Sequence, residues 1–258
     1  MSGLLLRLAG PMQSWGEHSA FGERDTLPHP SRSGLVGMFA AAQGVGRDEP
    51  LDRYDALRLT VRVDSPGLRM SDFQTVGGGL PRERTVPTAE GKRRPENATT
   101  IVTRKAFLAD AVFTVAVTGP GTEDIGAALV SPHWQTYLGR RSFVPDPLLL
   151  LRRGVADPVE ELRTGVPLPR VRVPEGAESV PVDLVVEGGA DGDDPRTGGD
   201  AGRSRTTLND VPRSFASLRR LYASREVRVD SVRVPVALVS RGWRDYQDRL
   251  FAYVKEHR

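Results

Sequence analysis

The pattern of apolar and polar side chains predicts sheet structure in the first part of the chain. Residues 4–8 form an apolar run that is closed by a Gly-Pro turn, which is typical of a buried strand. Residues 57–63 alternate between apolar and polar side chains, which predicts a strand with one face in the core and one solvated face. Residues 112–117 and 148–151 are further apolar stretches of strand length. We therefore expect a sheet built mainly from this part of the chain.

Two segments between these strands have helical spacing. Apolar side chains recur along one helical face over residues 35–45, after a candidate N-cap at Ser31 or Ser33. A second helix is expected over residues 124–130. The resulting order, strand-helix-strand-strand-helix-strand, predicts a ferredoxin-like α+β fold.

The segment at residues 71–106 interrupts this pattern. It is rich in Gly, Pro, Thr and Arg, shows little apolar periodicity, and carries seven Arg and Lys residues against three glutamates. Long uncovered connections are uncommon in compact domains and are often functional. The segment is therefore predicted to be a loop or hairpin that projects from the core and has a function of its own.

The composition changes after residue 170, which predicts a core domain at 1–170 and a smaller C-terminal region at 171–258. Residues 182–186 are a strand candidate. The Gly/Asp tract at 187–202 is strongly acidic, so we expect a solvated, disordered-looking loop there.

The chain ends in an amphipathic stretch that predicts a terminal helix. Its Trp and Tyr are interpreted as packing residues rather than as platforms for nucleobases. The apolar positions at helical spacing are Trp243, Tyr246, Leu250, Phe251 and Val254.

Composition and charge are those of an ordinary globular protein, with 258 residues, 38% of them hydrophobic, and a net charge of +3. The lack of cysteine excludes a disulfide scaffold, a Cys-ligated zinc site, an iron–sulfur cluster and a thiol nucleophile, and it suits a reducing cytoplasm. The apolar runs are far too short to span a bilayer and no signal peptide is visible, so we expect no membrane partner. Nearly all the basic residues are Arg, which reflects either a GC-rich genome or a preference for guanidinium groups at phosphates and bases.

The sequence contains no recognisable cofactor or metal site. The four histidines lack metal-ligand spacing, and the glycines at 44–46 and 77–79 lack the Lys-Ser/Thr sequel of a phosphate-binding P-loop. A metal-free ribonuclease is still possible, because it needs only a base, an acid and a cation near one phosphate. His18 or His29, with a Tyr or an Arg, are the candidates for that chemistry.

Two short segments suit the binding of a nucleic-acid backbone. Residues 137–142, Tyr-Leu-Gly-Arg-Arg-Ser, combine an aromatic ring, a glycine that allows close approach, two guanidinium groups and a hydroxyl. A plain surface turn is the alternative. Residues 30–34, Pro-Ser-Arg-Ser-Gly, precede the first predicted helix and offer backbone N–H groups to a phosphate, with an ordinary N-cap as the alternative.

Five fragments of the chain, taken in order, resemble the Cas-five family of the RAMP superfamily, the subunit of type I-E CRISPR Cascade that caps the 5′ handle of the CRISPR RNA (crRNA). The resemblance extends from residue 3 to about residue 230. The tract at 187–202 resembles an insertion relative to the family, and the segment after Asp230 extends past the family's usual end. The fragments are residues 6–16, 32–37, 72–76, 137–142 and 212–217.

This resemblance implies an RRM-like ferredoxin fold with a projecting β-hairpin thumb at about residues 71–106 and a smaller C-terminal part. It implies a non-catalytic, cytoplasmic RNA-binding protein that binds the 5′ handle of crRNA. Its partners would be the backbone subunit and the large subunit of Cascade, with target DNA met only indirectly through the complex. A related subtype of the family cleaves the repeat itself, so the alternative is a metal-independent endoribonuclease that processes CRISPR repeat RNA.

The positions that match the family pattern are the candidates for contact with the handle. We expect Arg32, Arg140 and Arg141 to bind phosphates. The backbone at Ser33 and Gly34 would fix the path of the RNA. Side chains of the thumb would splay a base at the junction of handle and spacer. The ring of Trp15 or Tyr137 would stack on a base, unless Trp15 belongs to the core. The full set of candidates is Gln13, Trp15, Arg32, Ser33, Gly34, Thr75, Val76, Gly77, Arg82, Arg84, Arg104, Tyr137, Gly139, Arg140, Arg141 and Ser142.

Overall fold

The computed structural model describes residues 2–17, 19–20, 22–79, 81–88, 91–95, 99–188, 204–216 and 219–256. In this part of the chain, the main sheet has seven strands in the order β11-β12-β10-β5-β8-β1-β9. Antiparallel pairing joins the strands that come from the first part of the chain, so the four strands predicted there are confirmed. These strands are β1 (Gly3–Ala9), β5 (Arg58–Ser65), β8 (Val112–Thr118) and β9 (Leu150–Val155).

Helices cover both faces of this sheet. α1 (Arg32–Gln43) and α2 (Thr122–Val130) share one core with Leu4 and Leu6 of β1. α3 (Pro158–Thr164) and α4 (Trp243–Lys255) share a second core with Leu5. Successive residues of β1 therefore point into two different cores, which explains the unbroken apolar run at 4–8.

The prediction of a solvated face on β5 is wrong. Arg62, on that face, is fully buried beside α3. Its Nε donates to Oδ1 of Asp64 at 2.5 Å, and its other nitrogens donate to the carbonyl oxygens of Leu162, Val166 and Pro167. The polar residue Arg62 in the alternating strand thus belongs to a buried ion pair, and its guanidinium also donates to the carbonyls at and just after the end of α3.

The C-terminal region adds strands to the same sheet rather than forming one of its own. β10 (Ser179–Glu187) pairs antiparallel with β5 and with β12 (Leu221–Pro235), and β12 pairs with β11 (Ser204–Ser214). The strand predicted at 182–186 is therefore confirmed. The predicted region 171–258 shares both cores with residues 1–170.

The acidic tract at 187–202 was predicted to be a solvated loop, but its first two residues continue the path of β10. Its first residue, Glu187, ends β10, and its side chain is only 7% exposed, in ion pairs with Arg32 at 2.7 Å and with Arg225 at 2.8 Å. Gly188 follows on the same path, with its N–H donating to the carbonyl of Glu226 at 2.8 Å. The remainder of the tract lies outside the described residues.

The predicted terminal helix is confirmed as α4. Tyr246 is fully buried, as expected, and its hydroxyl accepts a hydrogen bond from Nε of Arg7 at 3.2 Å. Burial raises the pKa of Tyr246 to about 12. Trp243 and Phe251 are instead 57% and 58% exposed, so only part of the expected packing is observed. No described helix is long and apolar enough to cross a lipid bilayer.

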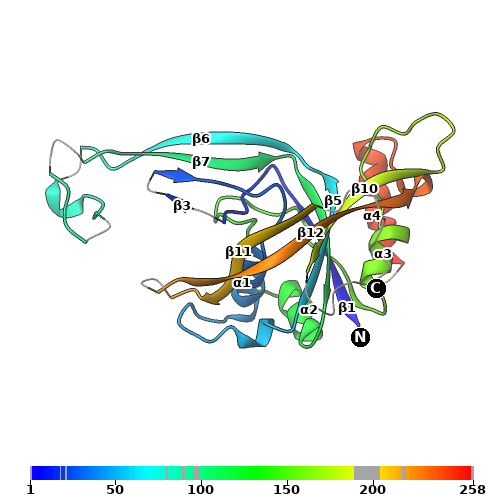
Figure 1. The fold of residues 1–258 in the computed structure, drawn as a ribbon, viewed down its shortest axis with the longest axis horizontal. Coiled ribbons are helices and arrows are strands. Elements are labelled where there is room, and N and C mark those ends of the chain that lie inside the picture. The colour runs from blue at the N-terminus through cyan, green and yellow to red at the C-terminus, as the bar shows by residue number, and fades with distance from the viewer. Residues whose placement is uncertain are drawn as a thin grey trace.

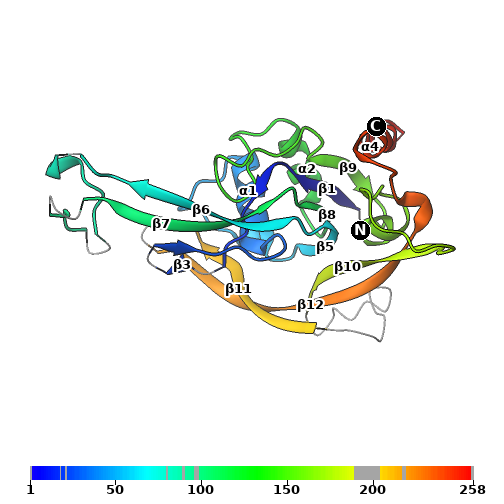
Figure 2. The same cartoon turned by 90° about the horizontal axis from the view of Figure 1, so that it is seen from above.

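The excursion predicted at 71–106 is a long hairpin. β6 (Leu68–Val76) and β7 (Ile101–Ala109) pair without a register shift and project from the body of the molecule, as Figures 1 and 2 show. The short strands β2 (Met12–Gln13) and β4 (Glu23–Arg24) pair with the other edge of β7, and β3 (Ser19–Ala20) pairs with β4. We call β6, β7 and their connection the thumb hairpin, with its root at the Leu68 and Ala109 end.

Candidate functional site

One backbone carbonyl joins three of the segments that the sequence singled out. The oxygen of Ala106, on β7, accepts hydrogen bonds from Oγ of Ser14 at 3.2 Å and from Nη2 of Arg140 at 2.7 Å. The N–H of Ser14 donates in turn to the carbonyl of Leu138 at 3.1 Å. The segment after β1, the turn at 137–142 and the root half of the thumb hairpin therefore meet at one place. We call the turn at 137–142 together with residues 104–106 the turn–hairpin surface.

Gly139 allows the turn at 137–142 to lie directly against the backbone of Ser14. Its φ is +86°, and a Cβ at this residue would lie 1.7 Å from the carbonyl oxygen of Ser14. No other residue type fits there without moving the backbone. The close approach that was expected at this glycine is thus an approach to the chain's own backbone.

Arg140 is the half-buried centre of the surface. Its guanidinium carbon lies 5.3 Å from the centroid of the Phe143 ring, in cation–π geometry. Burial lowers the pKa of Arg140 and the charge of Arg24 lowers it further, against an opposing effect of Asp72. An Arg keeps its charge at neutral pH despite such shifts. Among the described residues, Nη1 of Arg140 has no hydrogen-bond partner, so one buried donor is left without an acceptor.

The neighbouring positions offer polar groups to solvent. Arg141 and Ser142 are exposed on the same turn, and the Tyr137 side chain is partly exposed. Arg104 is exposed on β7, directly across the strand pair from Phe73, which is 60% exposed. Cations, hydroxyls and aromatic rings are therefore interleaved on this surface, as in many single-stranded RNA sites.

The other thumb candidates lie farther out along the hairpin. Thr75 and Val76 are exposed at the outer end of β6, where Val76 faces Ile101. Gly77 follows with φ +80°, and a Cβ there would lie 2.6 Å from the carbonyl oxygen of Thr99. Arg84 is exposed in the 3₁₀ turn η2 (Arg82–Arg84), whereas the side chain of Arg82 is outside the described part. The structure thus separates these residues from the turn at 137–142.

The structure contradicts direct RNA contact through the side chains of Gln13 and Trp15. Both are buried, with Trp15 only 1% exposed. Gln13 Nε2 donates to the carbonyls of Leu8 at 3.0 Å and Ala111 at 2.7 Å, and its Oε1 accepts from Nε1 of Trp15 at 3.2 Å. The indole ring packs over Gly34, where a Cβ would approach it to 2.8 Å. These residues hold the segment after β1 in place, and the core alternative for Trp15 is the correct one.

Phosphate binding by Arg32 is contradicted in the same way. Its guanidinium is buried and forms the ion pair with Glu187, and it also donates to the carbonyls of Tyr54 at 2.8 Å and Leu57 at 3.1 Å. Its backbone N–H, in the first turn of α1, donates to Oδ2 of Asp210 at 2.6 Å. A carboxylate of the protein therefore occupies the place where a phosphate was expected.

The rest of this helix start is an ordinary cap. Oγ of Ser31 accepts from the N–H of Gly34 at 3.2 Å and lies 3.3 Å from Oγ of Ser33. Of the two predicted N-cap candidates, Ser31 is the one that caps the helix, and the helix ends at Gly44, whose φ is +74°. Ser33 and Gly34 are only partly exposed, so this segment supports α1 and does not form an open anion site.

Sequence reasoning missed the buried ionic cluster behind this cap. Arg225 donates two hydrogen bonds to Asp210, from Nε to Oδ1 at 2.6 Å and from Nη2 to Oδ2 at 2.8 Å. It also forms an ion pair with Glu187. Its members come from the start of α1 and from three distant strands. No local motif signals such a cluster, because the acidic partners of Arg32 are more than a hundred residues away from it.

The histidines give little support to a nuclease site. His29 is buried, and its Nδ1 lies 3.2 Å from the carbonyl oxygen of Pro30. Burial lowers the pKa of His29 from 6.5, so the ring is neutral and shielded from solvent at neutral pH. His18, the other candidate, lies outside the described residues. The described ranges contain no group of three or more His, Asp or Glu that could hold a metal ion.

The same fold occurs in proteins of CRISPR systems. A chain in a solved structure titled "CRISPR RNA-guided surveillance complex" is 63% identical, with a TM-score of 0.87 over 98% of this chain and 99% of that one. Another structure, titled "Crystal structure of Cas protein", is 31% identical, with a TM-score of 0.60 over 92% of this chain and 97% of that one. The high coverage by the first includes most of the segment after Asp230, so that segment is not peculiar to this chain.

The sequence comparisons agree with the structural ones. The family model described as "CRISPR-associated protein (Cas_Cas5)" matches residues 3–228, and the chain belongs to this Cas5 family. The curated protein "CRISPR system Cascade subunit CasD" of Escherichia coli (strain K12) is 37% identical over 169 residues, which cover 62% of this chain and 75% of the relative. The resemblance that the five sequence fragments indicated is therefore confirmed.

Proposed function

We propose that this chain is a non-catalytic, crRNA-binding subunit of a CRISPR Cascade surveillance complex and that it binds the 5′ handle of the crRNA. Its membership of the Cas5 family and its similarity to a Cascade subunit support the assignment to such a complex. The shared acceptor at Ala106 carries the proposal of an RNA site, because it holds the turn and the thumb hairpin together as one surface.

The chemistry of the surface suits an RNA backbone. Arg140 and Arg141 supply guanidinium groups for phosphates, and Ser142 adds a hydroxyl donor. A phosphate oxygen would also provide the missing acceptor for Nη1 of Arg140. The ring of Tyr137 would stack on an unpaired base.

The thumb hairpin would act on the next nucleotides. We propose that Thr75, Val76 and Gly77 splay a base at the junction of handle and spacer, with Arg104 and the tip arginines Arg82 and Arg84 on the adjoining phosphates. Exposed apolar groups on β6 support this role, because they offer a wedge between bases.

For the fold, we propose an RRM-like ferredoxin core of the RAMP superfamily, followed by a smaller C-terminal part at 171–258. The neighbouring strands β9-β1-β8-β5, with α1 and α2 in one shared core, support it, since a β-α-β-β-α-β chain forms such a layer. The proposed protein partners are the backbone and large subunits of Cascade, and target DNA is reached through the complex. The absence of cysteine supports action in a reducing cytoplasm.

The competing function is a metal-independent endoribonuclease that cleaves CRISPR repeat RNA. The burial of His29 speaks against it, because a general base must reach the 2′-hydroxyl that it activates.

A gel-shift experiment in EDTA with 5′-labelled repeat RNA separates these functions. We expect the purified protein to retard the RNA without cutting it. The double substitution R140A/R141A is expected to weaken retardation at least about tenfold. The matched control R47A/R53A removes two exposed arginines elsewhere and is expected to bind as the unmodified protein does. Discrete cleavage that is lost on substitution of His18 or His29 would replace this proposal with the nuclease.

A further inference from the structure

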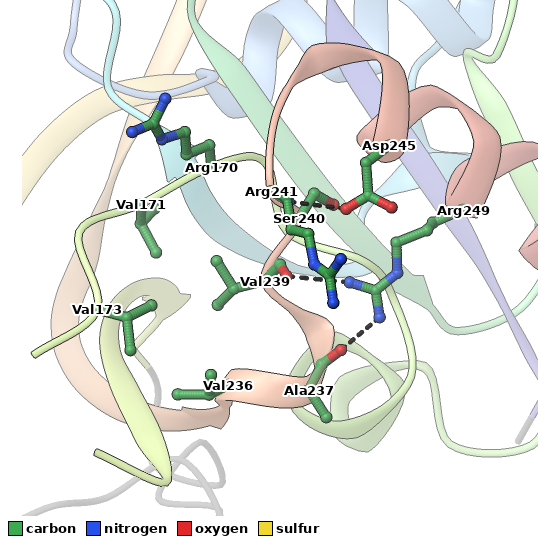
Figure 3. Close-up of a pocket in the computed structure, with 10 residues that line it drawn as sticks. All are labelled: Arg170, Val171, Val173, Val236, Ala237, Val239, Ser240, Arg241, Asp245 and Arg249. Carbon is green, nitrogen blue, oxygen red and sulfur yellow. Dashed lines mark hydrogen bonds between the residues drawn. The ribbon is translucent and has the colours of Figure 1, made fainter. Parts of the chain in front are cut away.

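A pocket of about 560 Å³ lies at the α4 end of the molecule, far from the tip of the thumb hairpin (Figures 1 and 3). It is bordered on one side by the segment that follows α3 and on the other by η5 (Val236–Leu238) and the start of α4. The lining residues are Arg170, Val171, Val173, Val236, Ala237, Val239, Ser240, Arg241, Asp245 and Arg249.

The lining combines an aliphatic floor with a cationic rim. Three of the described lining residues are arginines and one is an acid. That acid, Asp245, accepts a hydrogen bond from the backbone N–H of Arg241 at 2.7 Å. Arg249 donates to the carbonyls of Val239, at 3.1 Å, and Ala237. Those acceptors are neutral, so the described lining sets three guanidinium groups against the single carboxylate of Asp245.

One wall of the pocket is the segment after Leu168, which belongs to no helix or strand and has free backbone groups. Leu168 is fixed to the opposite wall, with its N–H donating to Leu238 at 2.8 Å and its carbonyl accepting from Ser240 at 3.0 Å. Beyond it, the backbone N–H and C=O groups of residues 170–173 have no hydrogen-bond partner within the described ranges. The hydroxyl of Ser240, buried in the opposite wall, also has none there. Unpaired extended backbone is an edge to which another strand can add.

We propose that this pocket binds an extended peptide segment of another protein, with Asp or Glu side chains that alternate with aliphatic ones. The peptide would pair with the free backbone of residues 170–173. Its carboxylates would meet Arg170, Arg241 and Arg249, and its aliphatic side chains would cover the valines of the floor. This inference is independent of the proposed RNA-binding function.

Charge and shape together favour a peptide over RNA. A phosphate would satisfy the arginines, but a ribose-phosphate chain would leave the valine floor in contact with polar groups and the backbone of residues 170–173 unpaired. A peptide with alternating acidic and aliphatic side chains would pair with the arginines, cover the valines and hydrogen-bond to the backbone of residues 170–173. The occupant is therefore defined by its backbone as well as by its charge.

The test uses the purified full chain and the fluorescein-labelled peptide Val-Glu-Val-Asp-Val, with binding followed by fluorescence anisotropy. We expect saturable binding that is absent for the peptide Val-Lys-Val-Lys-Val. R170E and R241E change exposed rim residues, and each is expected to weaken binding about fivefold to tenfold. R47E changes an exposed arginine that neither lines the pocket nor lies within residues 170–173, and it is expected to leave binding unchanged.

Four further outcomes would overturn the proposal. N-methylation of alternate peptide nitrogens removes the backbone donors, so unchanged affinity would exclude strand addition. No binding of the acidic peptide, or equal binding to all three arginine variants, would exclude this pocket as the peptide site. Single-stranded oligouridylate that binds in a manner sensitive to R170E and R241E, but not to R47E, would make the pocket a nucleic-acid site instead.

Discussion

The carboxylate of Asp210 lies 2.6 Å from the backbone nitrogen of Arg32, so β11 supplies the anion at the first turn of α1. Helix N-termini attract anions because their N–H groups are unpaired and aligned. Here this interaction links β11, in the C-terminal part of the sheet, to the first turn of α1. The chain's own carboxylate does what the sequence suggested a phosphate would do.

Loss of this carboxylate is expected to destabilise the whole fold. Asp210→Asn removes the charge that Arg225 grips and leaves a buried excess of positive charge with Glu187 as the counterion. We expect the free energy of unfolding, measured by urea denaturation, to fall by about 3 kcal/mol. The control R213A breaks the exposed pair between Arg213 and Asp55 and should cost less than about 1 kcal/mol. Equal losses in the two variants would contradict the role given to Asp210.

Gly139→Ala tests whether the proposed RNA site depends on the position of the turn at 137–142. The added Cβ would overlap the carbonyl oxygen of Ser14, so the turn must move away from the hairpin root. We expect RNA affinity in the gel shift to fall at least about tenfold, with a stability loss of more than about 1 kcal/mol. Gly176→Ala provides the control, because φ is +73° there but the space is open. Retained RNA affinity in Gly139→Ala would show that the turn need not be seated for binding.

His29 is expected to make the fold sensitive to mild acid. In the folded protein the pKa of His29 is lowered from 6.5. Below pH 6.5 the unfolded chain therefore binds a proton at His29 more readily than the folded chain does. The contribution of neutral His29 to the free energy of unfolding is complete above pH 6.5 and is lost as the pH falls below 6.5. His29→Gln should therefore show a smaller drop in unfolding free energy between pH 7.5 and pH 5 than the unmodified protein, by urea denaturation at each pH. His133→Gln, at an exposed histidine, should retain the full drop.

The salt dependence of RNA binding reports the phosphate contacts. Each cation that neutralises a phosphate of a single strand adds about 0.7 to the slope of log affinity against log salt concentration. Arg141→Ala should therefore reduce that slope by about 0.7, with little change in stability because the side chain is exposed. An unchanged slope, measured by anisotropy from low to moderate salt, would remove Arg141 from the set of phosphate contacts.

Phe73→Ser is expected to reduce self-association of the isolated chain. In the described residues β6 pairs with β7 alone, so it is an edge strand that carries an exposed aromatic ring. Such edges promote strand pairing between molecules. Light scattering of the variant during incubation at moderate temperature should rise more slowly than that of the unmodified protein. Phe251→Ser, at an equally exposed helical position, should have a smaller effect.

The sequence was informative where local pattern determines structure. Hydrophobic patterning predicted β1, β5, β8, β9, β10, α1, α2 and α4, and the basic excursion indicated the thumb hairpin, whereas α3, β11 and β12 were not predicted. The turn at 137–142 was also singled out from its residues, and in the structure Gly139 and Arg140 fix it against the Ser14 and Ala106 carbonyls. Phe143, the next residue, was missed although it continues the alternation of aromatic and basic groups.

Long-range partners could not be predicted from the sequence. Arg62 was expected in solvent because its ion pair needs the end of α3, and Arg32 was expected on phosphate because its partners are distant acids. A charged side chain has the same local signature whether it meets water, RNA or a buried carboxylate. The indole of Trp15 was undecided for the same reason, and only the position of α1 resolved it.

The alternation of β1 between two cores has a consequence for folding during synthesis. Arg7 of β1 is hydrogen-bonded to Tyr246 of α4, across 239 residues of sequence, and that helix completes the second core. When the ribosome has made β1, no partner for this face exists yet, so one side of the strand stays uncovered through most of translation. A chain with such long-range contacts folds slowly and exposes apolar surface to chaperones until α4 has left the exit tunnel.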